Sequence, residues 1–410
     1  MKKKFLYVGN FSFPFGNASG KRVYGNGKLL EELGYDVIFI GMSDSIKQST
    51  PLKKTEMAFK NFRYYNLPYP KSSLEWLFYK VAFNKLINFL EEEKIKEDLS
   101  AIIYYGNPRL SIFNYLLIKW CKNNNINIIS DCVDWLASKT GNIVYDFVKW
   151  ADTTYQKAYL NKKVDGVIAI SSYLENYYKK HGIKTVVIPP LSVNKLQDAT
   201  ITLDNDCKIK VLYAGLPFRK NTIIKDVKTL KDRIDQTIIF LSKIKEKDIN
   251  FVFDIYGFTK KEYLKALPNQ EKYIDILGDS ISFHGHQDNA HIVDKLKESD
   301  FTILLRDIKR DTMAGFPTKV SESMSLGIPV ITTITSDLER FIQDNENGFF
   351  LAIDDEKRAV EKLEKIFQLS KIDINKMKNF CIKANKFWFM HYKDDMETFL
   401  KDLTPSITEK

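Results

Sequence analysis

The alternation of short apolar runs with glycine-containing loops and helical segments constrains the fold of this chain more than any other feature of its sequence. The first run, KFLYVGN at residues 4–10, is followed by the loop FSFPFGNASG, a helical pattern that Gly34 ends, and the run YDVIFIG. Strand, glycine loop, helix and strand open a doubly wound α/β domain. The pattern continues to KTVVIPPL at residues 184–191 and starts afresh with KIKVLYAG at 208–215. The sequence therefore predicts two doubly wound domains in tandem.

The length of 410 residues supports two domains, because single cores seldom grow beyond about 250–300 residues. We expect an N-terminal, acceptor-binding Rossmann-like domain over residues 1–191 and a polar linker at 192–207. A C-terminal Rossmann-like domain over 208–385 follows, and a closing helix within 386–410 packs back on the first domain. Ligands of such folds bind at the carboxyl ends of the strands, so we expect an interdomain cleft.

Charge is distributed unevenly along the chain. Residues 1–200 carry 28 Lys and Arg against 18 Asp and Glu, which accounts for the whole net charge of +10. A membrane surface, a phosphorylated lipid or a nucleic acid would fit such a basic half, and so would a simple need for solubility. Nucleic acid is disfavoured because aromatic platforms interleaved with arginines are missing. The segment from Tyr65 to Leu90 mixes aromatic residues with lysines, so it either lies on a bilayer or covers the first sheet.

Targeting and redox features point to the cytoplasm. The apolar run near the N-terminus breaks at Asn10, too early for a signal peptide, and no run is long enough for a spanning helix. The four cysteines are scattered, which favours free thiols over disulfides or a thiolate metal site. We expect a cytoplasmic protein with possible peripheral contact at the inner face of the cell membrane.

Basic and glycine residues cluster where strands give way to helices. In the loop after the first strand, the amides of Gly16 and Gly20 either hold a phosphate or form a plain turn. After the strand of residues 208–215 come Arg219, Lys220 and Lys225, which could stabilise the charge of a departing diphosphate. Arg306, at the end of the strand DFTILLR, is either a further phosphate clamp or the first solvated residue after a buried strand.

The stretch GFPTKVSESMSLGIPV at residues 315–330 combines small residues with one acid. Pro317 suits the first position of a helix. The amides of Thr318 and Lys319 would then face a ligand with the positive end of the helix dipole, next to Gly315 and Phe316. Glu322 lies one turn further in and can accept hydrogen bonds from a ribose diol. The stretch therefore predicts a nucleotide-binding helix start.

At this point the chain resembles a known family. The tandem domains, YAG followed by a basic cluster, IYG, and the block ESMSLGIPVI resemble the GT-B glycosyltransferases, most closely the retaining enzymes of family 4. The resemblance implies transfer of a sugar from a nucleoside-diphosphate donor, UDP- or GDP-linked, with no cofactor and no required metal. It also implies catalytic-site roles for three residues: Arg219 and Lys225 on the diphosphate, with Lys220 as a competitor, and Glu322 on the ribose.

One position departs from the family pattern. The first glutamate of the E-x7-E motif, which holds sugar hydroxyls, is Ala314 here. Sugar recognition must come from elsewhere, for example from the amides of residues 315–318 or from Asp311. The change also leaves open a non-catalytic partner subunit, and a sugar-nucleotide epimerase on the same architecture is a further alternative.

Three further expectations complete the sequence-based picture. Asp131 and Asp134, at a strand end of the first domain, are candidates for the acceptor side or structural caps. Among His284, His286 and His291, two histidines at alternate strand positions could bind zinc. No nearby pattern supplies a convincing third ligand, so we predict no metal site. The predicted function is transfer of a sugar to a glycan, glycolipid or other hydroxyl acceptor in cell-surface polysaccharide or glycoconjugate synthesis.

Overall fold

The computed structural model describes residues 3–70, 80–106, 111–135, 143–194, 208–219 and 221–403. The chain forms two compact units. The first comprises Met1–Val193, Ala314–Phe316 and Trp388–Lys410, and the second comprises Asn194–Met313 and Pro317–Phe387. Most of the predicted linker, residues 195–207, lies outside the described residues.

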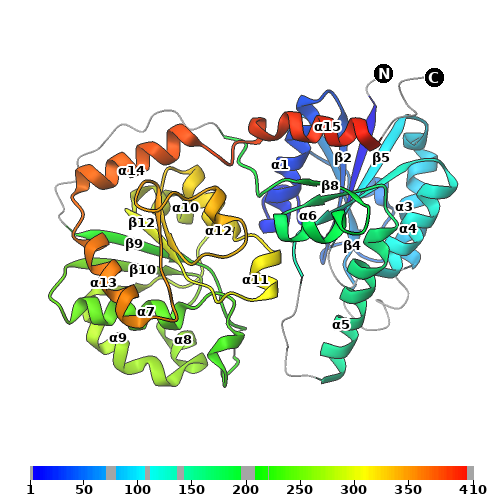
Figure 1. Ribbon diagram of the computed structural model, residues 1–410. Helices are drawn as coiled ribbons and strands as arrows, with labels where there is room; N and C mark the ends of the chain where they lie inside the picture. Colours follow the sequence, from blue (N-terminus) through cyan, green and yellow to red (C-terminus); the bar gives the residue numbers. More distant parts are fainter. Residues whose placement is uncertain are drawn as a thin grey trace. The chain divides into compact units, whose positions relative to one another are not determined.

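The first unit is built on a sheet of eight described strands in the order β3-β4-β2-β1-β5-β6-β7-β8 (Figure 1). Neighbouring strands are parallel except for the pair of β3 and β4. The strands are β1 (Lys4–Gly9), β2 (Asp36–Ser43), β3 (Met57–Phe59), β4 (Phe62–Pro68), β5 (Leu99–Tyr105), β6 (Asn127–Cys132), β7 (Gly166–Ala169) and β8 (Lys184–Val187). The central strands are buried on both faces, as near-continuous apolar runs require.

Helices cover both faces of this sheet. They are α1 (Ala18–Glu32), α3 (Lys80–Glu92), α4 (Ser111–Asn123), α5 (Ile143–Ala158), α6 (Ser172–Lys179) and α15 (Lys393–Leu403), with the short 3-10 helices η1 (Leu52–Thr55), η2 (Ile95–Asp98), η3 (Leu160–Lys162) and η8 (Phe389–Tyr392). On one face, Phe39 and Ile168 share a core cluster with Leu30 of α1 and Phe399 of α15. In Figure 1, α3 and α4 lie on the other side of the sheet. The closing segment therefore packs within the first unit.

The described part of the Tyr65–Leu90 segment belongs to the core. Tyr65 and Leu67 are buried in β4, and Leu86, Phe89 and Leu90 are buried on α3. Residues 71–79 lie outside the described residues. Of the two interpretations of this segment, the described residues agree with the helix that covers the sheet.

The second unit carries a parallel sheet of six described strands in the order β11-β10-β9-β12-β13-β14. The strands are β9 (Ile209–Ala214), β10 (Phe251–Tyr256), β11 (Ile281–Phe283), β12 (Phe301–Leu304), β13 (Val330–Thr332) and β14 (Gly348–Phe350). The strand order reverses between β9 and β12. The carboxyl ends of these two strands therefore form the topological switch point at which doubly wound sheets bind ligands.

Helices also cover both faces of the second sheet. They are α7 (Ile234–Lys245), α8 (Lys260–Ala266), α9 (Glu271–Leu277), α10 (Asn289–Glu298), α11 (Arg310–Ala314), α12 (Thr318–Ser325), α13 (Glu356–Phe367) and α14 (Lys371–Ala384), with the 3-10 helices η4 (Val227–Thr229), η5 (Pro268–Gln270), η6 (Gly278–Ser280) and η7 (Leu338–Arg340). In Figure 1, α7, α9 and α13 lie below the sheet, and α10, α12 and α14 lie above it. The predicted fold class, two Rossmann-like sheets with flanking helices, is confirmed.

Candidate functional site

The switch point of the second unit is organised by a buried carboxylate, Asp232, which stands just before α7. Its side chain accepts hydrogen bonds from Arg306 Nε at 2.8 Å, Lys319 Nζ at 2.5 Å and the Tyr213 hydroxyl at 2.9 Å. Tyr213 lies on β9, Arg306 follows β12 and Lys319 lies on α12. One acid thus joins both central strands to the helix that the sequence singled out.

The electrostatics of this cluster favour the charged carboxylate of Asp232 and the neutral hydroxyl of Tyr213. Burial by itself raises the pKa of Asp232, but the charges of Lys319 and Arg306 and the hydrogen bonds outweigh it, so the net pKa lies well below its usual range. Burial, with the neighbouring Asp232 charge, raises the pKa of the Tyr213 hydroxyl, which stays protonated as a donor. The cluster carries two cations and one anion, a net positive charge at this sheet edge.

Two glycines make room for the cluster at the ends of β9 and β10. A Cβ atom at Gly215 would lie 2.0 Å from Lys319 Nζ, so no larger residue fits while the lysine keeps its place. Gly257, at φ +116°, packs so tightly on the backbone of Gly215 that a Cβ atom there would lie 2.3 Å from its carbonyl oxygen. The missing side chains therefore let Lys319 and the two loop backbones pack closely where β9 enters its loop.

Helix α12 begins beside this cluster without a side-chain cap. Its N-cap residue is Pro317, so the helix starts one residue later than predicted, at Thr318. Within the described residues, no hydrogen bond uses the backbone amides of Thr318 and Lys319. Uncapped amides at the positive end of a helix form an anion site. Glu322 is half-buried one turn further along the same helix.

The predicted diphosphate ligands follow β9. Arg219 and Lys225 are both exposed in the loop between β9 and α7, and Lys220 lies outside the described residues. Of the two interpretations of Arg306, the solvated residue is wrong, because its guanidinium is buried, and a phosphate clamp would have to act from a side chain that is already bound to Asp232. Arg306 therefore contributes charge through the cluster rather than as a flexible side chain.

A second ion cluster supports the same edge. Arg233 binds Asp235 at 2.8 Å and Asp307 at 2.6 Å, and its amide donates to the carbonyl of Leu305 at 2.7 Å. Burial by itself raises the pKa of Asp307. The hydrogen bonds and charges of Lys309 and Arg233 lower it by more, so the net pKa lies below its usual range. These contacts tie the start of α7 to the end of β12.

The structure corrects the predicted acceptor role of Asp131. Its side chain is fully buried and accepts from Arg22 Nη2 at 2.6 Å, Arg22 Nε at 2.9 Å and the Tyr7 hydroxyl at 2.5 Å. A carboxylate bound in this way cannot reach an acceptor. Asp134 is half-buried and pairs with the buried Lys157 at 3.2 Å. It stays a candidate for the acceptor side, because part of its carboxyl group is exposed.

The backbone amides of Gly16 and Gly20, in the glycine loop of the first unit, form local hydrogen bonds. The amide of Gly20 donates to the side chain of Asn17, the N-cap of α1, at 2.8 Å. The amide of Gly16 donates to the carbonyl of Ser12 at 3.1 Å. A Cβ atom at Gly20 would lie 2.1 Å from that same carbonyl oxygen. Of the two interpretations of this loop, the tight turn is the one that the structure supports, and we correct the predicted phosphate cradle.

The segment before α12 provides backbone but no sugar-binding carboxylate. Ala314, at the position of the family glutamate, is fully buried. Gly315 and Phe316 are buried as well, and these residues group with the first unit. Asp311 is half-buried on α11. The structure therefore keeps open the question that Ala314 raised.

Histidine and cysteine side chains form no metal cluster in the described part of the chain. No group of three or more His, Cys, Asp or Glu residues there could hold an ion. His284 instead pairs with Asp254 at 2.6 Å and stacks on Tyr256. Cys121, Cys132 and Cys381 are buried free thiols.

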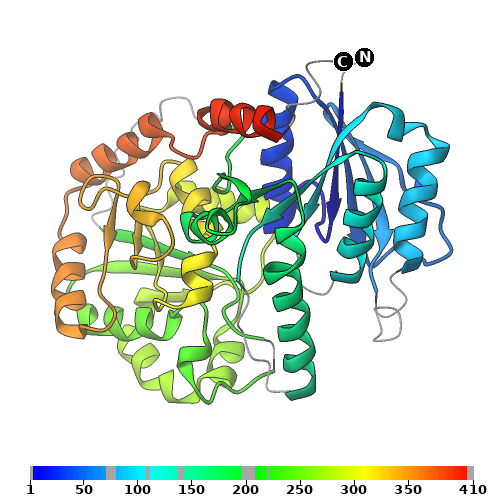
Figure 2. The same ribbon diagram turned by 45° about the vertical axis from the view of Figure 1, so that its right-hand side comes forward.

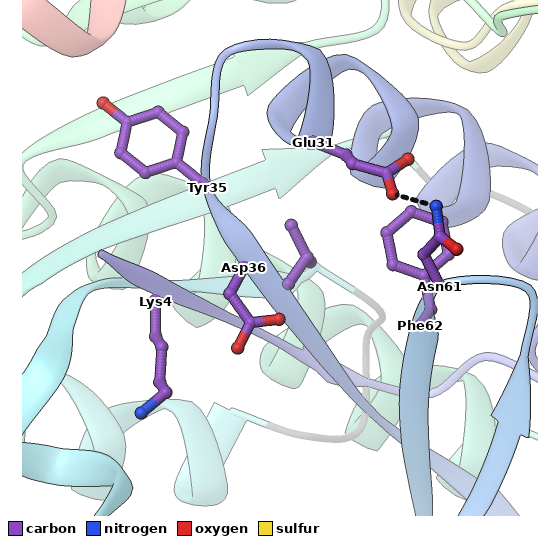
Figure 3. Close-up of a pocket in the computed structure, with 7 residues that line it drawn as sticks. Lys4, Glu31, Tyr35, Asp36, Asn61 and Phe62 are labelled. Carbon is purple, nitrogen blue, oxygen red and sulfur yellow. Dashed lines mark hydrogen bonds between the residues drawn. The ribbon is translucent and has the colours of Figure 1, made fainter. Parts of the chain in front are cut away.

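A cavity of about 380 Å³ lies elsewhere, at the amino ends of β1 and β2 (Figure 3). Its polar lining is already paired, since Lys4 binds Asp98 at 2.7 Å and Glu31 accepts from Asn61 at 2.8 Å. Ligands of parallel α/β sheets bind at the opposite, carboxyl edge. We therefore place the candidate site at the β9–β12 switch point.

Sequence reasoning found the strand ends and α12 but missed Asp232 and Tyr213. The string KTLKDRIDQ around Asp232 carries charges of both signs and shows no spacing that marks one acid as buried. The only available signal was its place two residues before Ile234, at the end of the loop that carries Arg219 and Lys225. That place does not reveal partners 74 and 87 residues away.

Comparison with known proteins defines the class. Residues 221–387 match the family "Glycosyl transferases group 1". Solved structures with the same fold include sucrose-phosphate synthase from Thermosynechococcus elongatus (14% identity, 98% of this chain, 99% of that chain, TM-score 0.66). A glycosyltransferase from Rickettsia africae ESF-5 (15%, 99% of each chain, 0.63) and Anabaena HepE in complex with UDP (13%, 97% and 100%, 0.63) share it too. No curated protein sequence matches the chain.

The fold is therefore GT-B, and residues 221–387, within the second unit, are similar to the group 1 glycosyl transferases. The resemblance to the GT-B glycosyltransferases, predicted from ESMSLGIPVI and from the tandem domains, is confirmed, and so is the prediction of a glycosyltransferase. Within the described residues, no helix is long and apolar enough to cross a membrane.

Proposed function

We propose that the protein is a retaining glycosyltransferase that moves a sugar from a nucleoside-diphosphate sugar to a hydroxyl of a glycan or a lipid-linked acceptor, without a metal. One observation carries the donor side of this proposal: the uncapped amides of Thr318 and Lys319 lie next to the Asp232 cluster at the switch point of the second sheet. HepE, which shares the fold, was solved with UDP, and this supports a nucleotide donor.

The chemistry asks little of a protein base. The bond between the anomeric carbon and the diphosphate oxygen breaks, and a bond to the acceptor oxygen forms on the same face of the sugar. The acceptor proton passes to the departing phosphate. The residues of the second unit would stabilise the charge on that phosphate through Arg219, Lys225 and the α12 amides, a role worth about 3 kcal/mol per well-placed donor. Glu322 would orient the ribose.

Thermal denaturation in the presence of UDP, GDP and their sugar conjugates tests the donor class. A ligand that binds only the folded protein raises Tm, and the best-matched base should raise it most. Retention is tested by the anomeric configuration of the product, determined by NMR. A panel in which no nucleotide shifts Tm would exclude the proposed donor site.

Replacing Arg219 and Lys225 together by alanine should lower kcat/KM for the nucleotide sugar by at least about 100-fold, because two charges near the diphosphate are lost. Both side chains are exposed, so Tm without ligand should stay unchanged. Lys243→Ala, an exposed lysine on the same unit, is the matched control. Unchanged turnover in the double variant would refute the assigned role.

Glu322→Gln should raise the Kd of the preferred nucleoside diphosphate about tenfold, because a hydrogen bond to a charged group is worth about 1.5–3 kcal/mol. Binding of inorganic diphosphate should stay the same, since it has no ribose. Calorimetric titration of both ligands separates the two contributions. Equal weakening of both would assign Glu322 to the structure of α12 rather than to the ribose.

A second candidate, a catalytically silent partner subunit, is favoured by Ala314, which offers no carboxylate for the sugar hydroxyls. Such a protein could still bind a nucleotide and shift Tm. It would show no slow hydrolysis of the donor, whereas a transferase shows it. Measuring free monosaccharide released over long incubation separates the two.

A further inference from the structure

Helix α5 exposes an apolar face. Phe147, Val148 and Trp150 are 64%, 59% and 60% exposed, and Tyr155 and Tyr159 are 39% and 44% exposed. Between residues 146 and 159, the exposed positions are Phe, Val, Trp, Thr, Tyr and Tyr, and none is charged. Large exposed apolar side chains that gather on one helix face mark an interaction site.

The opposite side of α5 holds the helix on its unit. Thr153, Gln156 and Lys157 are buried there, and Gln156 accepts from Asn114 of α4 at 2.9 Å. Ser111 of α4 also donates to Asp152, and α5 carries a second half-buried acid, Asp146, in its first turn. These buried polar contacts fix the orientation of α5. Its apolar face is therefore the exposed one.

Helix α4 extends this face. Ile112 and Tyr115 on it are 48% and 42% exposed. In both Figure 1 and Figure 2, α5 stands out from the rest of its unit as a long rod. We call the exposed residues Ile112, Tyr115, Phe147, Val148, Trp150, Tyr155 and Tyr159 the α4–α5 face.

Lysines border this face. Lys163 Nζ lies 4.0 Å from the centre of the Tyr159 ring, and Lys119 is exposed on α4, one turn beyond Tyr115. They belong to the half of the chain that carries the whole positive excess. Aromatic residues with flanking lysines are the composition of helices that lie in the headgroup region of a bilayer.

We propose that the α4–α5 face docks on a membrane surface that contains anionic lipids. Charge complementarity selects this occupant, because a second copy of the chain would bring the same lysines against each other. This inference rests on the proposed function, because docking serves transfer to a lipid-linked acceptor. A protein held at the bilayer can reach such an acceptor. It also relocates the predicted membrane contact from Tyr65–Leu90 to α4 and α5.

Co-sedimentation with vesicles tests the proposal. The full chain should sediment with vesicles of equimolar phosphatidylcholine and phosphatidylglycerol, less with phosphatidylcholine alone, and less again at high salt. The double variant Phe147→Ser/Trp150→Ser should lose at least about tenfold in partitioning, because two large apolar side chains no longer leave water on docking. Ile372→Ser, an equally exposed apolar residue on α14, is the matched control and should sediment like the wild type.

Two results would overturn the proposal. One is vesicle binding that the double variant retains. The other is a wild-type oligomer in sedimentation velocity that the double variant dissociates, which would assign the face to a second copy. Nucleotide-induced Tm shifts and slow donor hydrolysis should be the same in the double variant and the wild type. Failure of docking is therefore distinguishable from failure of the proposed activity.

Discussion

Asp232→Asn is expected to lower the free energy of unfolding of the second unit by about 3–5 kcal/mol, because it leaves the buried Arg306 without its anion. Lys319 also loses its anchor at 2.5 Å, so nucleotide binding should weaken as well. Urea denaturation measures the first effect and calorimetric titration the second. Asp294→Asn, an acid 69% exposed in the same unit, should change stability by less than about 1 kcal/mol.

The same carboxylate makes the unit sensitive to acid. The pKa of Asp232 in the folded state is depressed, so its contribution is fully present above the unfolded pKa of about 3.9. The contribution is lost as the pH falls below that value toward the folded pKa. Asp232→Asn should therefore show a flatter decline of stability in this acidic range than the wild type. A parallel decline in both proteins would show that Asp232 is not the titrating group.

Arg22→Met should destabilise the first unit by about 3–5 kcal/mol, because Asp131 is fully buried and would lose its cation. Urea denaturation measures this loss of stability.

Lys401→Met is the control for this variant. Its ammonium group belongs to an exposed i,i+4 pair with Glu397, and its side chain is 72% exposed. Its loss should cost less than about 1 kcal/mol in the same urea denaturation. A comparably small cost for Arg22→Met would mean that Asp131 finds water or another partner, and would reopen its assignment as a structural residue.

These two carboxylates show where sequence-based prediction of the site reached its limit. Asp131 was predicted from its place at a strand end, and that place is right, but strand ends hold both ligand-binding and structural acids. Its partner Arg22 lies 109 residues away. Arg306 was predicted at the correct edge too, and its engagement with Asp232 could not be foreseen because nothing in DFTILLR indicates a partner 74 residues upstream.

The face of α5 presents the same distinction for a surface. Its aromatic residues recur at helical spacing, a pattern that a core-facing helix shares. Only the packed structure reveals that Gln156 and Lys157 face inward and Phe147 and Trp150 outward.

The sequence by itself determined the class of fold. The chain alternates apolar runs, each long enough for a buried strand, with glycine loops and helices, and this pattern fits little other than tandem doubly wound sheets. The block ESMSLGIPVI indicated that these sheets belong to a GT-B fold. The tertiary structure alone decided which charges remain exposed, as on Arg219 and Lys225, and which are held in buried ion pairs, as in the Asp232 and Asp131 clusters. The physical reason is that hydrophobic periodicity is a local property of the chain, whereas ion pairing depends on distances between residues that only folding brings together.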